Sequence, residues 1–163
     1  MQYSYFVYKK SEYNIKVNRM PIWFKEVQSE GDVNEGHIIL HSNNDYDENW
    51  GADAKMEINW LKKERLDFLH YQEVQNSIDV FNAINMVITE KENTWVMSHE
   101  FTYWFGNRSK MIRKKYYVEN AIHSIFYCDL TERLFSIHTS IINKHFDNFK
   151  PYILESFKSI ICH

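Results

Sequence analysis

The spacing of hydrophobic residues along the chain changes twice, and these changes predict where strands give way to a helix. Residues 54–62 alternate apolar and polar side chains, which is typical of a half-buried strand. From residue 70 to residue 87 the apolar positions recur at steps of three and four instead, which predicts an amphipathic helix. After Asn93 the alternation returns and continues to Ile142. The pattern therefore predicts strands on both sides of one helix.

The segment after Asn93 is long enough for four consecutive strands, which we place at residues 94–105, 109–118, 121–129 and 134–142. Gly106-Asn107 has the glycine-first form of a tight hairpin turn, so we expect the first two of these strands to be joined there. Two shorter strands are expected earlier, at residues 13–20 and 36–42. Pro21 should end the first of these, because proline cannot donate to a strand ladder.

The chain should finish with a second amphipathic helix. Asp147 or Asn148 could cap its start, and Pro151 would then lie in the first turn, where proline is tolerated. Its apolar stripe consists of Phe146, Phe149, Ile153, Phe157 and Ile160. Each large side chain that this stripe buries against the sheet stabilises the fold by about 1.5–3 kcal/mol before entropy is subtracted.

Length and composition agree with one α+β domain over residues 1–163. A chain of 163 residues suits a single domain, and 17% aromatic residues favour a sheet-rich one. We therefore predict a largely antiparallel sheet that ends in a four-strand C-terminal meander and is flanked by two main helices.

This order of elements, together with several short motifs, resembles the Mog1/PsbP-like family. The segments that carry the resemblance are residues 13–23 and 71–87, His99-Glu100, Phe126-Tyr127-Cys128-Asp129, Arg133-Leu134-Phe135, Ser156-Phe157 and Cys162-His163. The later motifs are also similar to small uncharacterised archaeal proteins of that fold. The resemblance implies a curved antiparallel sheet sandwiched by helices. Its members bind partners as different as a small GTPase and a photosystem, so it implies no particular partner and no binding residue.

Four residues near the end of the chain could supply metal ligands. Cys128, Cys162, His163 and His99 offer the thiolates and imidazoles that zinc prefers. No cysteine pair has the usual two-to-four-residue spacing, so the site would have to assemble from two strands and the terminal helix. Side chains of adjacent helical residues point about 100° apart, so Cys162 and His163 could share an ion only if the helix frays before them.

The same cysteines have two other interpretations. They could be small apolar packing groups, with His163 a solvated residue. They could also form a disulfide, because the terminal helix should bring Cys162 to the sheet face that carries Cys128. We expect their Cα atoms to lie within about 7 Å, the range that a disulfide requires. Packing, disulfide and metal all remain open on the sequence alone.

Other polar groups suggest local roles. His123, Tyr127 and Asp129 share a strand face, whereas His99 and Glu100 point to opposite faces, and no nucleophile stands beside them. Asp129 and Arg133 flank a tight turn and are expected to form an ion pair worth about 0–1 kcal/mol.

The basic residues Arg108, Lys110, Arg113, Lys114 and Lys115 lie beside Tyr116-Tyr117. We interpret them as a charged hairpin facing solvent. Asp45-x-Asp47-x-Asn49 begins like a calcium loop but lacks its glycine and final glutamate.

The net charge and the absence of common motifs argue against several classes of function. A net charge of −3 argues against nucleic acid, and no apolar run is long enough to cross a membrane. The first residues lack the features of a signal peptide, so we expect a cytoplasmic protein. Common nucleotide-binding and hydrolase motifs are absent, and we assign no cofactor and no catalytic residue. Two hypotheses follow. One is a non-catalytic protein-binding or scaffold domain, and the other is a small metalloprotein or enzyme built around the Cys/His group.

Overall fold

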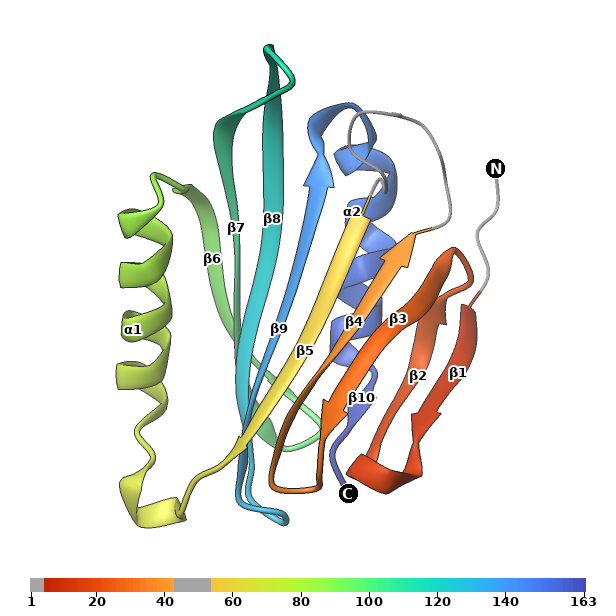
Figure 1. Ribbon diagram of the computed structural model, residues 1–163. Helices are drawn as coiled ribbons and strands as arrows, with labels where there is room; N and C mark the ends of the chain where they lie inside the picture. Colours follow the sequence, from red (N-terminus) through yellow and green to blue (C-terminus); the bar gives the residue numbers. More distant parts are fainter. Residues whose placement is uncertain (1–4, 43–53) are drawn as a thin grey trace.

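The computed structural model describes residues 5–42 and 54–163, and it contains two antiparallel sheets and two α-helices (Figure 1). Strands β1 to β5 are Tyr5–Lys10, Ile15–Pro21, Phe24–Gly31, Glu35–Ser42 and Ala54–Lys62. Helix α1 is His70–Ala83, and strands β6 to β9 are Val87–Val96, His99–Ile112, Lys115–Cys128 and Arg133–Ile142. Helix α2 is Asn143–Lys158, and β10 is Ile160–Ile161. The predicted α+β class is confirmed.

The larger sheet has seven strands in the order β3-β4-β5-β9-β8-β7-β6, and every neighbouring pair is antiparallel. The smaller sheet has the order β1-β2-β10. Its last strand is formed by the two residues that precede Cys162, and Ile160 pairs with Val17 of β2. This pairing fixes the end of the chain beside the start of the chain.

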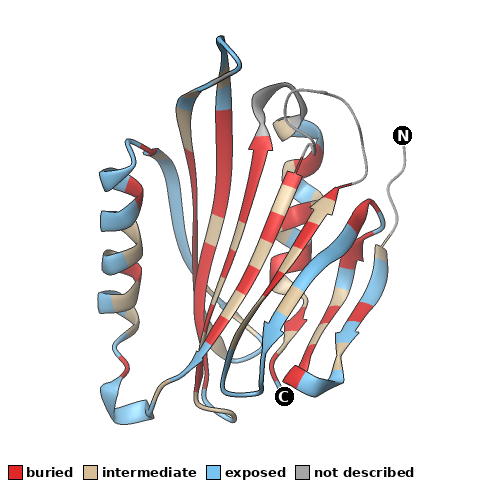
Figure 2. Cartoon of the chain, in the orientation of Figure 1, coloured by how far each residue is buried: buried red, intermediate tan, exposed pale blue. Residues whose placement is uncertain are grey.

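The two helices lie on opposite faces of the larger sheet (Figure 1). Helix α2 packs against β8 and β9 and also against β2, so one face is covered by this helix and the smaller sheet. Helix α1 packs on the other face near β6 and β8. Because side chains alternate along a strand, buried Tyr103 belongs to the core under α2 and buried Trp104 to the core under α1. Figure 2 shows this alternation as bands of buried and partly exposed residues along β4 and β5.

The expected hairpin turn at Gly106-Asn107 is wrong. Gly106 lies inside β7, where it pairs with Ala121, and β7 and β8 are joined instead at Arg113 and Lys114, whose φ angles are 50° and 66°. A side chain at Gly106 would place its Cβ 2.8 Å from Cγ of Met86. A side chain is therefore disfavoured here by the close approach of Met86, which precedes β6, and no turn is involved.

The predicted strand at residues 94–105 is also wrong as a single strand. It is interrupted at Met97 and Ser98, where positive φ angles of 51° and 69° form the tight turn between β6 and β7. The meander still has four strands. Strand β6 begins earlier than expected, at Val87, and β8 contains part of each of the two shorter strands expected at 109–118 and 121–129.

The terminal helix begins earlier than expected. It starts at Asn143, so Pro151 lies in its interior and the predicted caps at Asp147 and Asn148 are wrong. The helix also ends at Lys158, so Ile160, which we assigned to its stripe, belongs to β10.

Strands β1 and β3 were not predicted, and α1 ends at Ala83 instead of residue 87. The loop with the calcium-like pattern at residues 45–49 lies outside the described residues.

Candidate metal centre and the neighbouring pocket

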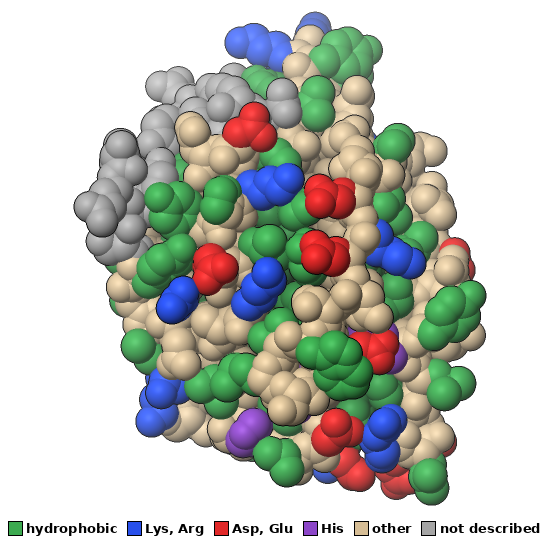
Figure 3. Space-filling model, turned by 180° about the vertical axis from the view of Figure 1, so that it is seen from behind, with side chains coloured by type: hydrophobic (Ala, Val, Ile, Leu, Met, Phe, Trp, Pro, Cys, Tyr) green, Lys and Arg blue, Asp and Glu red, His purple; other side chains and the backbone are tan. Residues whose placement is uncertain are grey.

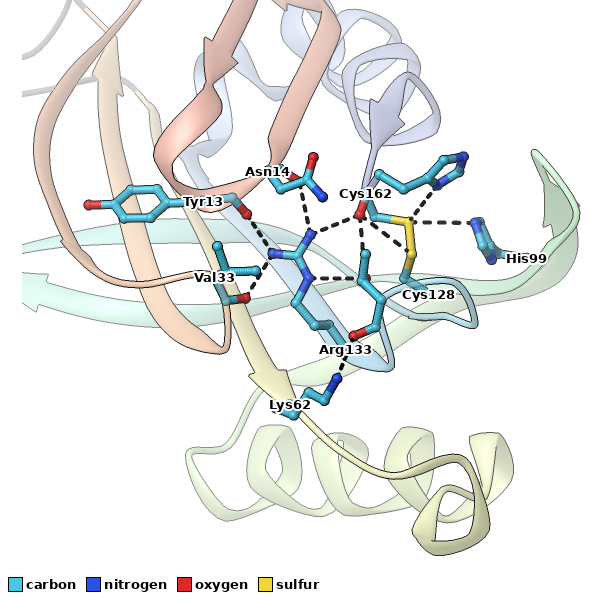
Figure 4. The surroundings of a disulfide bond; sticks show 10 residues. Tyr13, Asn14, Val33, Lys62, His99, Cys128, Arg133 and Cys162 are labelled. Carbon is cyan, nitrogen blue, oxygen red and sulfur yellow. Dashed lines mark hydrogen bonds between the residues drawn. A yellow bond between two sulfur atoms is a disulfide. The ribbon is translucent and has the colours of Figure 1, made fainter.

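The structure joins Cys128, the last residue of β8, to Cys162, which follows β10, in a disulfide (Figure 4). Their Cα atoms are 6.3 Å apart, inside the range expected from the sequence, and both residues are buried. Pairing of β10 with β2 holds Cys162 over the end of β8. A bridge over a sequence separation of 34 residues stabilises a fold by about 3–4 kcal/mol in the chain-entropy model.

Two histidines complete a compact cluster around the disulfide. Sγ of Cys162 lies 3.6 Å from Nε2 of His99 and 3.6 Å from Nδ1 of His163. One ligand atom from each of His99, Cys128, Cys162 and His163 lies within 4.8 Å of all the others. We call these four residues the Cys/His cluster. Two sulfurs and two imidazole nitrogens are a donor set that zinc binds in proteins.

On the sequence alone, Cys162 and His163 were expected to point apart because they would be adjacent residues of a helix, and this restriction does not apply to the structure. Helix α2 ends four residues before Cys162, so Cys162 and His163 follow a strand and are not constrained to helical directions. His99 is the first residue of β7, immediately after the tight turn at Met97 and Ser98, and this turn directs it toward Cys162. Burial lowers the pKa of His99 below its ordinary value, so its imidazole is neutral near pH 7.

Arg133 holds the chain segments around the cluster together. Its buried guanidinium donates to the carbonyl oxygens of Tyr13, Asn14, Val33 and Cys162 at 2.6–3.1 Å (Figure 4). These carbonyls belong to the β1–β2 connection, the β3–β4 connection and the segment after β10. One side chain on β9 therefore fixes three segments that are far apart in the sequence.

The expected ion pair between Asp129 and Arg133 is wrong. Asp129 instead pairs with Arg65, with Nε and Oδ1 3.0 Å apart and both side chains more than half exposed. The carboxylate of Asp129 is therefore exposed at the surface, whereas the guanidinium of Arg133 donates hydrogen bonds to backbone carbonyls in the interior.

A pocket of about 260 Å³ lies on the sheet face opposite to the disulfide. It is lined by Arg65, Phe68, Leu69, His70, Trp95, Glu100, Tyr127 and Asp129. Phe68 and Tyr127 stack with their ring centroids 4.3 Å apart, and they form one wall. Nε2 of His70 lies 2.7 Å from Oγ1 of Thr102, and burial lowers the pKa of this histidine. His99 and Glu100 do face opposite sides, as expected, so one turn serves both the cluster and the pocket.

Leu69 and Trp95, which line this pocket, are exposed, and other exposed large apolar side chains lie on the neighbouring connections. They come from the β5–α1 connection, the first turn of α1, the end of β6, the β6–β7 turn and the β8–β9 turn, and these connections lie at the lower end of the molecule in Figure 1. The exposed members are Leu66, Leu69, Tyr71, Trp95, Met97 and Leu130. We call this surface the apolar end. The sequence pattern did not reveal it, because residues 94–105 were expected to form one strand, whereas the turn at Met97 and Ser98 interrupts them and Trp95 is exposed.

A second histidine pair lies under α1. His123 and His138 approach with their Nδ1 atoms 3.0 Å apart, and the ring of Phe81 packs on both. His123 shares the strand face of Tyr127, as expected, but pairs with His138 and not with Asp129. Burial lowers the pKa of both histidines, and that of His123 falls well below its ordinary value. Both rings are therefore neutral near pH 7.

This pair predicts a loss of stability in mild acid. The unfolded chain binds protons at these histidines below about pH 6.5 and the folded chain does not, so the free energy of unfolding falls as the pH falls. The slope is at most about 1.4 kcal/mol per pH unit for each histidine. The double replacement His123→Leu with His138→Leu should reduce this slope, as measured by urea unfolding between about pH 7 and about pH 5. Part of the slope should remain, because burial also lowers the pKa of His41, His70 and His99. Lys55, Glu57, Arg108 and Glu119 lie near His138 and are unchanged in this comparison. An equal slope in the variant would contradict the assignment.

Two of the basic residues near Tyr116 lie beside an acidic side chain. Arg108 lies 3.0 Å and Lys110 3.7 Å from the carboxylate of Glu119, which neutralises part of their charge. Acidic and basic side chains are also interspersed on the face of the molecule shown in Figure 3. This distribution agrees with a charged hairpin facing solvent. Among the described residues, neither helix has the length and apolar character needed to span a bilayer.

No protein-family model matches the sequence, and no curated protein matches it either. Solved structures do match nearly the whole chain. PsbP (CyanoP) from the cyanobacterium Synechocystis sp. PCC 6803 has a TM-score of 0.61 at 12% identity, covering 96% of this chain and 91% of that one. PA94 from Pseudomonas aeruginosa, a protein of unknown function described as a putative regulator, has a TM-score of 0.60 at 7% identity, covering 97% and 96%. A mutant of protein Mog1 has a TM-score of 0.61 at 8% identity, covering 99% and 96%.

The chain therefore has a Mog1/PsbP-like fold, as the resemblance implied. At such low identities the likeness shows the fold and carries no function with it. The similarity to archaeal proteins finds no support in these structures.

Proposed function

We propose that this protein is a non-catalytic protein-binding domain and that its partner docks on the apolar end. The observation that carries the proposal is the group of exposed large apolar side chains around the pocket, with Trp95 exposed by 70% and Leu69 by 69%. Exposed aromatic residues beside a pocket are typical of the few side chains that dominate binding between proteins. Apolar patches of this kind on a folded domain commonly mark interaction sites.

The size of the pocket favours a protein segment over a cofactor. Small-molecule and cofactor sites usually enclose about 300–1,000 Å³. At about 260 Å³, this pocket lies just below that range, and it can accept one or two side chains. We therefore commit to a segment of a partner protein that inserts an apolar side chain against Phe68 and Tyr127. The carboxylates of Glu100 and Asp129 at the rim would accept hydrogen bonds from the backbone or from a basic side chain of that segment.

The walls of the pocket are held in place before any partner binds. The guanidinium of Arg65 pairs with Asp129 and lies 5.7 Å from the ring centroids of both Phe68 and Tyr127. The Tyr127 hydroxyl donates to the carbonyl of Lys63 at 2.5 Å. Walls that are already ordered reduce the entropy that binding costs.

Trp95→Ala is expected to weaken binding by at least about 30-fold, the effect of losing a residue that dominates an interface. The probe is a displayed library of random peptides, selected on the untagged full chain. Peptides with an apolar anchor should be enriched, and their affinities are then measured by calorimetry on each variant. Tyr116→Ala is the matched control, since Tyr116 is an equally exposed aromatic residue at the opposite end of the molecule. Peptides that bind both variants as tightly as the unchanged chain would refute the proposed surface.

A second candidate function is supported by a separate observation. The four ligand atoms of the Cys/His cluster favour a metalloprotein, which is independent of protein binding at the apolar end.

A further inference from the structure

We propose that His99, Cys128, Cys162 and His163 bind one Zn²⁺ ion when the disulfide is reduced. The cluster would then have two forms, a disulfide without metal and a dithiolate with metal. This inference rests on the metalloprotein candidate named above and is independent of the proposed protein-binding surface.

The distances in the disulfide form already resemble those of a zinc site. Zinc lies about 2.3 Å from thiolate sulfur and about 2.0–2.1 Å from imidazole nitrogen, so tetrahedral ligands place sulfur and nitrogen roughly 3.6 Å apart. Nε2 of His99 and Nδ1 of His163 each lie 3.6 Å from Sγ of Cys162. All four donor atoms fall within 4.8 Å of one another. The main change needed is separation of the two sulfurs to roughly 3.8 Å once their bond is broken.

The surrounding structure keeps the donors together after reduction. Pairing of Ile160 with Val17 places Cys162, and the hydrogen bond of 2.8 Å from Arg133 to the Cys162 carbonyl fixes its backbone. Neither interaction depends on the bond between the sulfurs. A site whose ligands are fixed by surrounding contacts binds its metal without ordering the chain first.

The charge of the metal form suits its buried position. Two thiolates balance the two positive charges of Zn²⁺, and neutral imidazoles add none. A neutral group costs much less to bury than an isolated ion, and both cysteines are almost fully buried. His163 is exposed, so it lies where an ion could enter the site from solvent.

The proposed conversion is balanced in electrons and protons. A thiol reductant supplies two electrons and two protons to the disulfide, yields two thiols and is itself oxidised to a disulfide. Zn²⁺ then replaces the two thiol protons, which are released to solvent. Oxidation of the zinc-bound thiolates by a disulfide oxidant reverses the process and releases the metal.

The test compares the untagged full chain in its oxidised and reduced forms without oxygen. Zn²⁺ alone is the probe, and a chromophoric chelator competes for it. The reduced chain should bind one equivalent of zinc, and the oxidised chain should bind none at the same concentration. Co²⁺ in place of Zn²⁺ should give the thiolate-to-metal absorption that histidine-only surface sites lack.

His99→Ala should weaken zinc binding by more than the roughly 10–100-fold typical of losing an outer-shell partner of a metal. His37→Ala is the matched control, because His37 lies on β4, away from the cluster. Equal affinity in the two variants would overturn the proposal, as would equal binding by oxidised and reduced chains. If His99→Ala does not fold, the comparison of the unchanged chain in its two redox forms decides alone. If the reduced chain unfolds, zinc should restore its structure, and failure to do so would also overturn the site.

Discussion

Arg133→Met is expected to lower the free energy of unfolding by about 3–5 kcal/mol. Methionine matches the aliphatic part of arginine but has no hydrogen-bond donors, so the carbonyl oxygens of Tyr13, Asn14 and Val33 would lose this partner. The Cys162 carbonyl would keep only the longer hydrogen bond from Thr131. Leaving a buried polar group unpaired costs about 1–3 kcal/mol for each group, and water can satisfy only part of this set. The side chain is fully buried in the folded protein, which limits that rescue.

The measurement is urea unfolding followed by tryptophan fluorescence, with the disulfide intact in every variant. Arg19→Met is the matched control, because the guanidinium of Arg19 forms an exposed pair with Glu155 at 2.9 Å. Exposed pairs contribute only about 0–1 kcal/mol. Arg133→Lys should also be destabilised, because lysine cannot reproduce the planar set of donors. If Arg133→Met unfolds at the same urea concentration as Arg19→Met, the role assigned to this side chain is wrong.

The role of Arg133 illustrates what the sequence could not predict. A charged residue four positions after Asp129, across a turn, is most simply interpreted as part of an exposed ion pair, and nothing in its local sequence suggests burial. Its partners are backbone carbonyls 29 to 120 residues away, and every residue type carries a carbonyl. Partners of this kind leave no pattern in the sequence, so they appear only when the fold is known.

The predicted strand boundaries were wrong for a related reason. Gly106 has the local sequence of a turn, but a side chain is disfavoured there by Met86 on a neighbouring segment. The actual turns, at Met97-Ser98 and Arg113-Lys114, contain no glycine or proline. Their positive φ angles are imposed by the long strand pairings on either side, which override local preference.

The predictions that succeeded depended on periodicity. The alternation in residues 54–62 and the apolar steps after His70 gave the correct element types, because burial on one face constrains every second or every third and fourth residue. The same reasoning placed Cys128 on the sheet face that meets the end of the chain. His99 was considered only because imidazole is a zinc ligand, and the turn that directs His99 to Cys162 was not foreseen.

Phe157→Ala is expected to destabilise the folded chain by about 3–5 kcal/mol, the range for truncating a fully buried aromatic side chain. Phe157 lies in the last turn of α2 and is 1% exposed within the core shared by this helix and both sheets. Truncation removes apolar contacts and leaves a cavity, and the surrounding strands are too firmly paired to close it. The loss should also loosen the attachment of β10, which begins two residues after the helix ends.

The effect is measured by urea unfolding of the oxidised chain, so that the Cys128–Cys162 bond is present in both states. Phe6→Ala is the matched control, since Phe6 on β1 is 38% exposed and its truncation removes less buried surface. We expect the unfolding midpoint of Phe157→Ala to lie well below that of Phe6→Ala, with a similar dependence on urea concentration. Equal midpoints would show that the end of α2 contributes little to the core. The smaller sheet would then be held to the larger one mainly by the disulfide and by the hydrogen bonds of Arg133.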